Sequence, residues 1–354
     1  MDLSFVNQKV LVVGGAGFVG SNLCKLLLKD YEPAEVLVID NLLSAESCNV
    51  PIDDRVNFIC GSISDDKVLD KIPDDINYVF HLACYHGNQS SIEDPLADHE
   101  NNTLTSLKLF NRLYRYSGIK KVVYAAAGCA VAEKTYDTAS ATAEDAPVSL
   151  FHDSPYSISK LIGEMYGNYF FKLHKLPFVK ARFQNVYGPG EILGAGLWRG
   201  TRHTVWRNVT PTFIWKSLHN EALPLDNGGI ATRDFIYVED MARGLIACAL
   251  KGDPGETYNL ATGVETSIWD LANTINSYTG NEAGISVEKP RDWDNSGKRF
   301  GTTEKSEAQL GFRAQVSIQD GIKATVEWTR NNQEKIASTM EKHVHFLPEV
   351  TKYL

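Results

Sequence analysis

Short apolar runs alternate with longer amphipathic stretches along the first half of the chain. The apolar runs are rich in β-branched and aromatic residues, are flanked by turn residues, and lie at 10–13, 36–39, 56–60, 78–82, 122–126 and 178–183. Segments of helical length, such as 21–29 and 103–116, separate them. Uniformly apolar strands that alternate with helices predict a parallel sheet covered on both faces, which is a doubly wound α/β fold.

The pattern changes after Gly188-Pro189-Gly190. Residues 190–208 are rich in Gly, Trp and Arg and show no clean period. Beyond them, 208–220 predicts a helix, 231–238 a strand and 240–250 another helix. We expect this region to form a smaller mixed α/β lobe laid against the first domain.

Composition excludes several classes of protein. The chain has 35 basic and 44 acidic side chains, a net charge of −9, so it is a poor candidate for binding nucleic acid or an anionic membrane surface. Its six cysteines are scattered, without a C-x-x-C pair or a histidine cluster at zinc spacing, which indicates reduced thiols and no metal site. The first residues do not resemble a signal peptide, and no apolar stretch is long enough to span a bilayer. We expect a cytoplasmic enzyme.

The first apolar run leads directly into a glycine-rich turn, Gly14-Gly15-Ala16-Gly17-Phe18-Val19-Gly20. Glycines at this spacing allow a sharp turn and let the backbone approach a pyrophosphate, which the free N–H groups of the following helix then bind. The second strand ends in Asp40, which can accept hydrogen bonds from both ribose hydroxyls and would repel a 2′-phosphate. No arginine follows it, so the pattern favours NAD over NADP. The alternative is an ordinary turn and an aspartate at a strand end.

A candidate reacting group lies at the start of a later helix. Ser154 can cap this helix and Pro155 suits its first turn. Tyr156 and Lys160 then lie on one face, four residues apart. A lysine ammonium beside a phenol, with a cationic nicotinamide above it, is expected to lower the phenol pKa and make Tyr156 a general acid and base. The alternative is an ordinary surface pair on a helix.

Together, the glycine turn and the Tyr156-x-x-x-Lys160 spacing resemble the extended short-chain dehydrogenase/reductases, the family of nucleotide-sugar epimerases and dehydratases. The likeness covers most of the chain and includes 79–83, 101–103, 181–189 and 233–238. It implies a Rossmann domain over 1–188, to which about 233–262 returns, and a nucleotide-sugar-binding lobe over 189–232 and about 263–340. It also implies a homodimer and a role in making polysaccharide precursors such as those of O-antigen.

The resemblance also assigns site residues. Those expected to bind NAD are Gly14, Gly17, Phe18, Val19, Gly20, Asp40, Asn41, Ser62, Ile63, Leu82, Ala83, Asn102, Tyr156 and Lys160. Those expected to bind the sugar nucleotide, with a UDP-sugar as the expected substrate, are His86, Asn185, Arg199, Arg207, Arg233, Arg291 and Asp294. Guanidinium groups suit a diphosphate because they donate paired hydrogen bonds. For each arginine the alternative is a surface salt bridge of little energetic value.

The sequence departs from the family at the end of the fifth strand. Ala127 occupies the position of a serine or threonine that shares the proton of the sugar hydroxyl with the tyrosine, and Ser157 and Ser159 should point elsewhere. Gly128 and Cys129 follow, where the 4,6-dehydratases have Asp and Glu. In GDP-mannose 3,5-epimerase the second position is a cysteine that moves a proton at carbon, so Cys129 is either catalytic or a small buried side chain.

Three hypotheses follow from these residues. The first is an NAD-dependent nucleotide-sugar epimerase that works through a transient 4-keto sugar, with Tyr156, Lys160 and Cys129 as catalytic residues and His86 as a second candidate near the sugar. The second is a dehydratase or 4-keto reductase, which Gly128 and Cys129 disfavour. The third, allowed by Ala127, is a catalytically weak NAD-binding protein.

Overall fold

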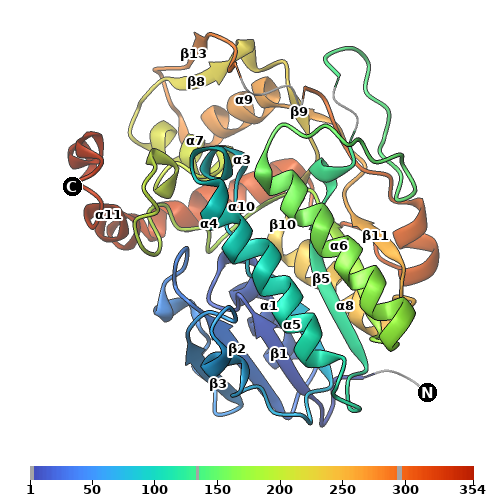
Figure 1. Ribbon diagram of the computed structural model, residues 1–354. Helices are drawn as coiled ribbons and strands as arrows, with labels where there is room; N and C mark the ends of the chain where they lie inside the picture. The colour runs from blue at the N-terminus through green and yellow to red at the C-terminus, as the bar shows by residue number, and fades with distance from the viewer. Residues whose placement is uncertain (1–3, 133–134, 293–296) are drawn as a thin grey trace.

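A parallel sheet forms the centre of the computed structural model, which describes residues 4–132, 135–292 and 297–354. Within these residues the sheet has seven strands in the order β11-β6-β5-β4-β1-β2-β3 (Figure 1). The strands are β1 (Lys9–Val13), β2 (Glu35–Asp40), β3 (Val56–Cys60), β4 (Tyr78–His81), β5 (Lys121–Ala127), β6 (Phe178–Phe183) and β11 (Thr257–Leu260). All six apolar runs of the first half are strands of this sheet, so the predicted doubly wound α/β fold is confirmed.

Helices cover both faces of the sheet. The main ones are α1 (Phe18–Asp30) and α8 (Val238–Lys251) on one face, and α5 (Thr105–Leu113) and α6 (Pro155–His174) on the other. Shorter helical segments connect them, namely α2 (Asp66–Leu69), α3 (Asn88–Glu93), α4 (Pro95–Asp98), a π-helical segment (His99–Leu104) and a 3₁₀ turn (Gly128–Ala130).

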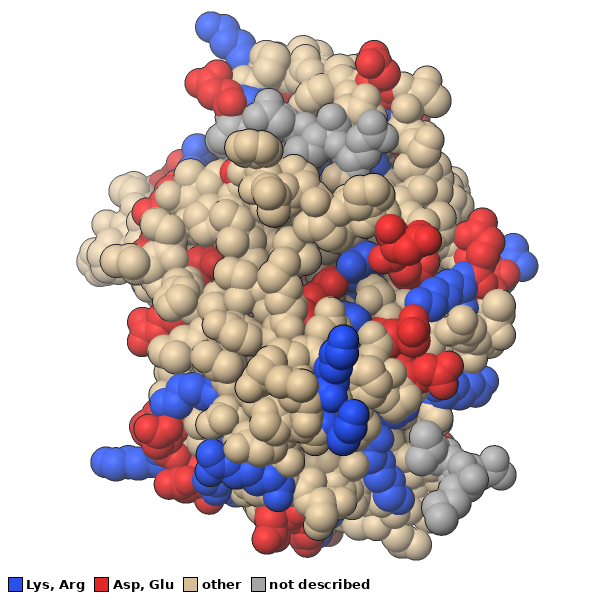
Figure 2. All heavy atoms as spheres, turned by 45° about the vertical axis from the view of Figure 1, so that its right-hand side comes forward, with Lys and Arg blue, Asp and Glu red and all other residues tan. Residues whose placement is uncertain are grey.

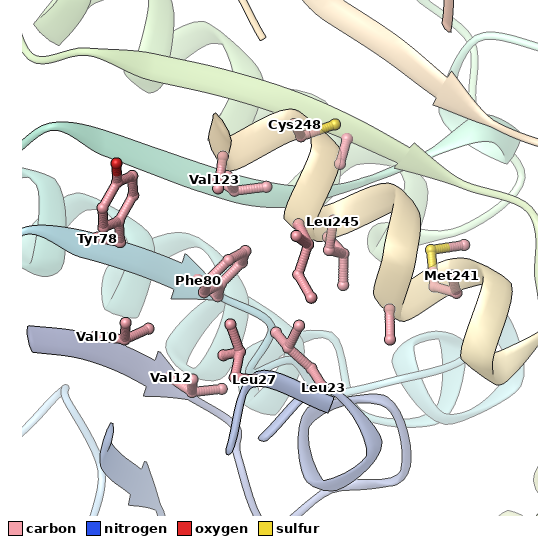
Figure 3. Close-up of a cluster of buried hydrophobic side chains, with 14 of the residues drawn as sticks. Val10, Val12, Leu23, Leu27, Tyr78, Phe80, Val123, Met241, Leu245 and Cys248 are labelled. Carbon is pink, nitrogen blue, oxygen red and sulfur yellow. The ribbon is translucent and has the colours of Figure 1, made fainter. Parts of the chain in front are cut away.

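The apolar runs form strands because their side chains are buried between these helices. Figure 3 shows one such cluster, in which side chains of β1, β4 and β5 meet those of α1 and α8. Phe80, Leu23 and Leu245 lie at its centre and are fully buried. Burying one such side chain contributes about 1.5–3 kcal/mol, so the cluster holds the strand ends in fixed positions.

The lobe lies beyond the carboxyl ends of the strands and has a core of its own (Figure 1). It contains α7 (Val209–Leu218), β8 (Leu223–Asp226), α9 (Ile268–Thr279), β13 (Ile285–Glu288) and α10 (Ile318–Asn331), and α11 (Gln333–Glu341) follows at its side. Between α7 and α9 the chain passes back through α8 and β11, and β11 pairs with β6 of the main sheet. The division into two domains at the boundaries given above stays a prediction.

One predicted strand is wrong as a single element. Residues 231–238 form two short strands, β9 (Thr232–Arg233) and β10 (Phe235–Tyr237), which pair in different directions with β12 (Thr266–Ser267) and β7 (Asn185–Tyr187). Between them lies Asp234, whose carboxylate accepts hydrogen bonds from the backbone N–H groups of Thr262 and Gly263. Such a buried acceptor fixes the break, because leaving it unpaired would cost about 1–3 kcal/mol.

The surface carries charges of both signs. On the face shown in Figure 2, acidic and basic side chains of the described residues are interspersed and form no broad basic patch. Among those residues, no group of histidine, cysteine and acidic side chains is placed to hold a metal ion. The helices of the described ranges are all too short or too polar to cross a bilayer.

Candidate functional site

A cavity of about 850 Å³ opens at the carboxyl ends of the strands, between the sheet and the lobe. It includes the ends of β1 and β4, which are neighbours in the sheet although they are not consecutive in the chain. At such a switch in strand order the connections leave in opposite directions and open a crevice, where ligands bind in doubly wound folds. The cavity is therefore the candidate site.

The glycine turn forms one wall of this cavity. Gly14 has a φ of 87°, and a Cβ there would lie 2.6 Å from the backbone nitrogen of Ala83. A Cβ on Gly20 would overlap the backbone of Gly14, so α1 packs against the turn only because both residues are glycine. No side chain caps α1 within the described residues, and its first turn carries no acidic residue. Gly14, Gly17, Phe18, Val19 and Gly20 all line the cavity.

Asp40 and its neighbours line the next part of the cavity, together with Asn41, Ser62 and Ile63. The Asp40 carboxylate accepts hydrogen bonds from the backbone N–H groups of Leu42, at 2.9 Å, and Ala16, at 3.1 Å. Burial raises the pKa of Asp40, although these hydrogen bonds oppose the shift. The side chain is thus fixed between the glycine turn and the end of β2.

Leu82 and Ala83 line the cavity as expected, but Asn102 does not. The Asn102 side chain is buried, where it accepts a hydrogen bond from the Tyr85 backbone N–H at 2.7 Å and donates one to Asp98 at 2.7 Å. Asn102 therefore fixes the loop after β4 from the side that faces away from the cavity. The structure does not bring Asn102 to the cofactor side, because its amide is already engaged with the protein.

Tyr156 and Lys160 lie in the first turns of α6 and both line the cavity. Ser154 caps this helix through the Ser157 backbone N–H, as its sequence predicts. The Lys160 ammonium donates a hydrogen bond to the carbonyl oxygen of Ala125 at 2.9 Å and lies 5.8 Å from the centre of the Tyr156 ring. The sequence had placed both groups together correctly.

Burial raises the pKa of the Tyr156 phenol well above its ordinary value, and the neighbouring Cys84 and Cys129 thiols act in the same direction. Within the protein alone, the phenol therefore holds its proton firmly. The lower pKa expected from Lys160 together with a bound cationic nicotinamide stays a prediction.

Ala127 and Cys129 complete this part of the wall. Ala127 is the last residue of β5, and its methyl group lines the cavity where a hydroxyl was expected from the family. Cys129 also lines the cavity, and its Sγ lies 3.9 Å from the Ser157 Oγ. Neither Ser157 nor Ser159 lines the cavity, as predicted; the Ser157 hydroxyl accepts from that of Ser154, and the Ser159 hydroxyl donates to the Tyr156 carbonyl and accepts from Asn102.

His86 also faces the cavity, opposite Tyr156. The two rings meet edge to face with centres 5.7 Å apart. The Nε2 of His86 is 3.0 Å from the Oδ1 of Asn208, which also lines the cavity. The amide of Asn208 in turn donates a hydrogen bond to Glu191. The imidazole is thereby held in place by the lobe.

One thiol of this site was not predicted from the sequence. Cys84 lies directly after Ala83 and lines the cavity. Burial raises the pKa of Cys84, but the Lys160 ammonium and the His86 side chain outweigh it, so the pKa falls to about 7. The available signal was its position, because the loop that follows the fourth strand borders the crevice at the switch in strand order.

The expected sugar-nucleotide ligands are only partly brought together. Asn185, Arg233 and Arg291 line the lobe side of the cavity. The Arg233 guanidinium donates a hydrogen bond to the Thr232 carbonyl at 2.6 Å, and Arg291 forms an ion pair with Asp226. Asp294 lies outside the described residues.

Two other arginines of the lobe serve as braces. Arg199 does not line the cavity, because its buried guanidinium donates to the His86 and His203 carbonyls and lies 5.1 Å from the Tyr85 ring centre. Arg207 reaches the cavity wall but donates to the carbonyl of Ser44 at 3.0 Å and also to those of Thr204 and Ala195. Burial lowers the pKa of Arg207 to about 9. Both guanidinium groups therefore join backbone segments of the protein to one another.

Comparison with known proteins agrees with this geometry. Residues 10–261 match the NAD dependent epimerase/dehydratase family. The chain is 58% identical to the Bordetella bronchiseptica enzyme WbmF, solved in complex with NAD+ and UDP, with a TM-score of 0.87 over 98% of this chain and 99% of that one. It is 30% identical to UDP-glucose 4-epimerase of Mycolicibacterium smegmatis over 92% of this chain and all of the relative. It is 27% identical to mouse dTDP-D-glucose 4,6-dehydratase over 92% of this chain and 89% of the relative. The chain is therefore a member of the NAD dependent epimerase/dehydratase family.

Proposed function

We propose that this protein is an NAD-dependent nucleotide-sugar epimerase. The observation that carries the proposal is a single cavity, which joins the glycine turn, the Tyr156–Lys160 pair and the arginines of the lobe. A cofactor at the turn and a sugar nucleotide at the lobe would place their reacting ends on either side of Tyr156. This arrangement suits hydride transfer between a bound cofactor and a sugar.

The residues present fit NAD. A Cβ at Gly14 or Gly20 would collide with the backbone of Ala83 or Gly14, so the turn can be this tight only with glycine, and the uncapped end of α1 offers backbone N–H groups to a pyrophosphate. Asp40 suits the ribose hydroxyls and disfavours a 2′-phosphate. When bound, NAD takes a hydride from the sugar and returns it. The proposed NAD contacts are those predicted from the sequence, apart from Asn102.

The residues of this chain would bind and orient the sugar and move its protons. Tyr156 would exchange a proton with the C4 hydroxyl, and Lys160 would hold the nicotinamide ribose. Once C4 is a ketone, the hydrogens at C3 and C5 are acidic, and Cys129 is placed on the cavity wall to remove one of them. His86, whose ring contacts that of Tyr156, would bind the sugar.

An epimerase is favoured over a dehydratase by the residues after β5. The family resemblance places the acidic pair of the 4,6-dehydratases at the positions of Gly128 and Cys129. In this chain neither carries a carboxylate, and the following residue is Ala130. Elimination of water would lack its acid and base here, whereas epimerisation needs none at these positions if C4 alone is inverted.

A UDP-sugar is the proposed substrate. WbmF, at 58% identity, is solved with UDP as well as NAD+. In this chain Asn185, Arg233 and Arg291 line the corresponding side of the cavity and would bind the diphosphate. From the same resemblance we propose a role in supplying precursors of a polysaccharide such as an O-antigen. The six cysteines are all free thiols, which supports a reducing, cytoplasmic location.

We also propose a homodimer. Apolar side chains on α4 and α6 are exposed, among them Leu96 at 80% and Leu173 at 63%. Met165 and Tyr169 of α6 are also about half exposed. A second copy of this helical face would cover them. Light scattering of the purified protein should give twice the mass of the chain, and Leu173→Glu should reduce it to that of one chain.

Proton NMR in D₂O tests the function. The protein is mixed with UDP-, GDP-, CDP- and dTDP-hexoses and uronates, and new anomeric signals are recorded. Inversion without deuterium in the sugar would mean that C4 is inverted through NAD alone. Deuterium at C3 or C5 would mean carbon-acid chemistry, which Cys129→Ala should then abolish. Bound NAD with no turnover of any sugar nucleotide would overturn the proposal in favour of a cofactor-binding protein, which Ala127 makes the second candidate.

A further inference from the structure

The end of β6 brings one more polar side chain to the cavity. Gln184 follows directly after β6, which pairs with β5 so that Phe183 lies beside Ala127. Gln184 therefore lies next to Gly128, the residue after Ala127. It lines the cavity together with Ala127 and Cys129. The mechanism proposed above gives Gln184 no task.

The side-chain amide of Gln184 is packed between two glycines. A Cβ on Gly128 would lie 2.5 Å from its Nε2 and 3.0 Å from its Oε1. A Cβ on Gly301 would lie 2.8 Å from the same Nε2. Both distances to Nε2 are well below an ordinary van der Waals contact of about 3.5–4 Å. The amide thus occupies the space that a side chain at either position would need.

Neither glycine is required by its own backbone. Gly128 and Gly301 both lie outside the left-handed region that favours glycine. Gly128 begins the 3₁₀ turn after β5, and Gly301 forms a β-bridge with Thr142. Other residues adopt both of these conformations. The requirement for glycine at the two positions therefore comes from the Gln184 amide that lies against them.

The backbone on the Gly301 side of the amide is held firmly. The residues on either side of Gly301 pair with Thr142, because the Phe300 carbonyl accepts from the Thr142 N–H at 2.9 Å and the Thr302 N–H donates to the Thr142 carbonyl at 3.0 Å. A side chain between fixed segments of backbone has few rotamers open to it. Little conformational entropy is then lost when the Gln184 amide binds a ligand.

The Gln184 amide has unused hydrogen-bonding capacity. It is half-buried, and within the described residues no hydrogen bond joins it to another group of the protein. An amide has two N–H donors and a carbonyl oxygen that accepts. Because unpaired polar groups shielded from water are costly, a ligand that offers partners to this amide gains affinity. The side chain is thus prepared to bind a polar group in the cavity.

The position of the amide indicates which part of the substrate it meets. It lies against Gly128, and the next residue, Cys129, has its Sγ 3.9 Å from the Ser157 Oγ, in the same turn of α6 as Tyr156. This is the part of the wall where the sugar would react. A neutral amide at this place suits a neutral group that donates and accepts hydrogen bonds, as a hydroxyl or an amide does.

We propose that Gln184 is a specificity-determining residue whose amide, held between Gly128 and Gly301, binds a neutral hydroxyl or amide substituent of the sugar beside the reacting carbon. This deepens the proposed function and rests on it. The packing also accounts for the absence of an acid at position 128, since the Gln184 amide occupies the space that a side chain there would need. A neutral binding group thus lies where elimination of water would need a carboxylate.

The first experiment tests the packing without a sugar nucleotide. In the NAD-loaded protein, Gly128→Ala places a Cβ against the amide and should lower the melting temperature by about 3 °C. In a Gln184→Ala background the same change should lower it by less than about 1 °C, because the space is then free. Gly118→Ala, whose Cβ would meet neighbours at 3.5 Å or more, is the control. Equal losses in both backgrounds would overturn the packing on which the proposal stands.

The second experiment separates recognition of the sugar from recognition of the nucleotide. The NAD-loaded wild type and Gln184→Met, which is similar in size, are titrated by calorimetry with UDP, UDP-glucose and UDP-N-acetylglucosamine. Gln184→Met should bind a UDP-sugar about tenfold more weakly, through loss of one neutral hydrogen bond, and UDP less than about twofold more weakly. A loss with both sugars indicates a hydroxyl as the bound group, and a loss with the acetamido sugar alone indicates the amide. Gln319→Met, at an exposed position of α10, is the control.

The outcomes separate the two proposals. If no sugar nucleotide binds, the proposed function fails and the recognition of a sugar fails with it. If a sugar nucleotide is turned over and Gln184→Met binds it as tightly as the wild type does, the epimerase stands and the role of Gln184 is overturned. Equal losses for UDP and for the UDP-sugars would also overturn it, since that pattern indicates a general distortion of the cavity.

Discussion

The cavity has two walls, the cofactor wall, formed by the glycine turn and the end of β2, and the lobe wall, formed by the loops of the lobe. The roles of residues could be predicted from sequence spacing much better on the first wall than on the second. On the cofactor wall, every residue predicted from the glycine turn and from the end of β2 lines the cavity. On the lobe wall, Arg199 and Arg207 were expected to bind the sugar nucleotide, and both donate hydrogen bonds to backbone carbonyls. The cofactor wall is made of backbone whose course the glycines fix. The lobe wall is made of long side chains in irregular loops, and their partners come from distant segments.

We expect the cofactor wall to lose its affinity for NAD when its backbone is displaced. In Gly20→Ala the new Cβ would overlap the Gly14 backbone and force α1 away from the turn. NAD affinity, measured by calorimetry, should fall about 100-fold, because the displaced helix would lose about two hydrogen bonds to the charged pyrophosphate. Gly118→Ala is the matched control, because its Cβ would meet neighbours at 3.5 Å or more. Normal NAD binding by Gly20→Ala would show that the turn is not the pyrophosphate site.

On the lobe wall, we expect replacing Arg207 to lower the stability of the protein and to leave its affinity for UDP nearly unchanged. Arg207→Met removes the donor to the carbonyls of Ser44, Thr204 and Ala195, and should lower the free energy of unfolding by about 2 kcal/mol in urea titrations. UDP affinity should change less than about threefold. Arg202→Met, which removes an exposed ion pair with Glu349, should cost under about 0.5 kcal/mol. A tenfold loss of UDP affinity at unchanged stability would restore Arg207 as a ligand.

Replacing Asp40, on the cofactor wall, is expected to weaken NAD binding and, at the same time, to raise the stability of the protein without NAD. Asp40→Asn should weaken NAD binding about tenfold, because an amide has only one acceptor oxygen for the two ribose hydroxyls. Since burial raises the pKa of Asp40, the folded state holds this proton more tightly than the unfolded state. The stability contributed by this group is complete below the ordinary aspartate pKa and is lost as the pH rises through the folded value.

The pH dependence gives the second measurement on this variant. Without NAD, Asp40→Asn should gain stability relative to the wild type between acid and neutral pH in thermal unfolding. Asp54→Asn, at an exposed position after β2, is the control and should follow the wild type. A stability difference that shrinks as the pH rises would contradict the role assigned to burial.

Much of the fold could be predicted because the relevant patterns are local. The six apolar runs became strands of the sheet, and Ser154 and Pro155 mark the start of α6 correctly. The strand expected over 231–238 failed because of a contact that local pattern does not contain. Asp234 is fixed by Thr262 and Gly263, which lie in a loop far along the chain.

The candidate site was harder to predict where function depends on what surrounds a side chain. Spacing places Tyr156 beside Lys160, but it does not say that burial and two thiols raise the phenol pKa. Nor does it say that Asn102 is already engaged with Tyr85 and Asp98. His86 was predicted from the sequence, yet it meets Asn208, and Asn208 meets Glu191, only in the folded protein.

The segment after β2 gives the molecule a kinetic property. Ser44 accepts from Arg207, Glu46 accepts from the Gly196 backbone and from Lys342, and Asn49 donates to the Ala16 carbonyl of the glycine turn. These contacts join the lobe to the segment after β2, next to the glycine turn, and they form without any sugar. A cofactor there would have to break these contacts to leave, while a sugar nucleotide would not. Such a protein would keep one cofactor molecule through many turnovers, so its rate would not follow the ratio of oxidised to reduced cofactor in the surrounding medium.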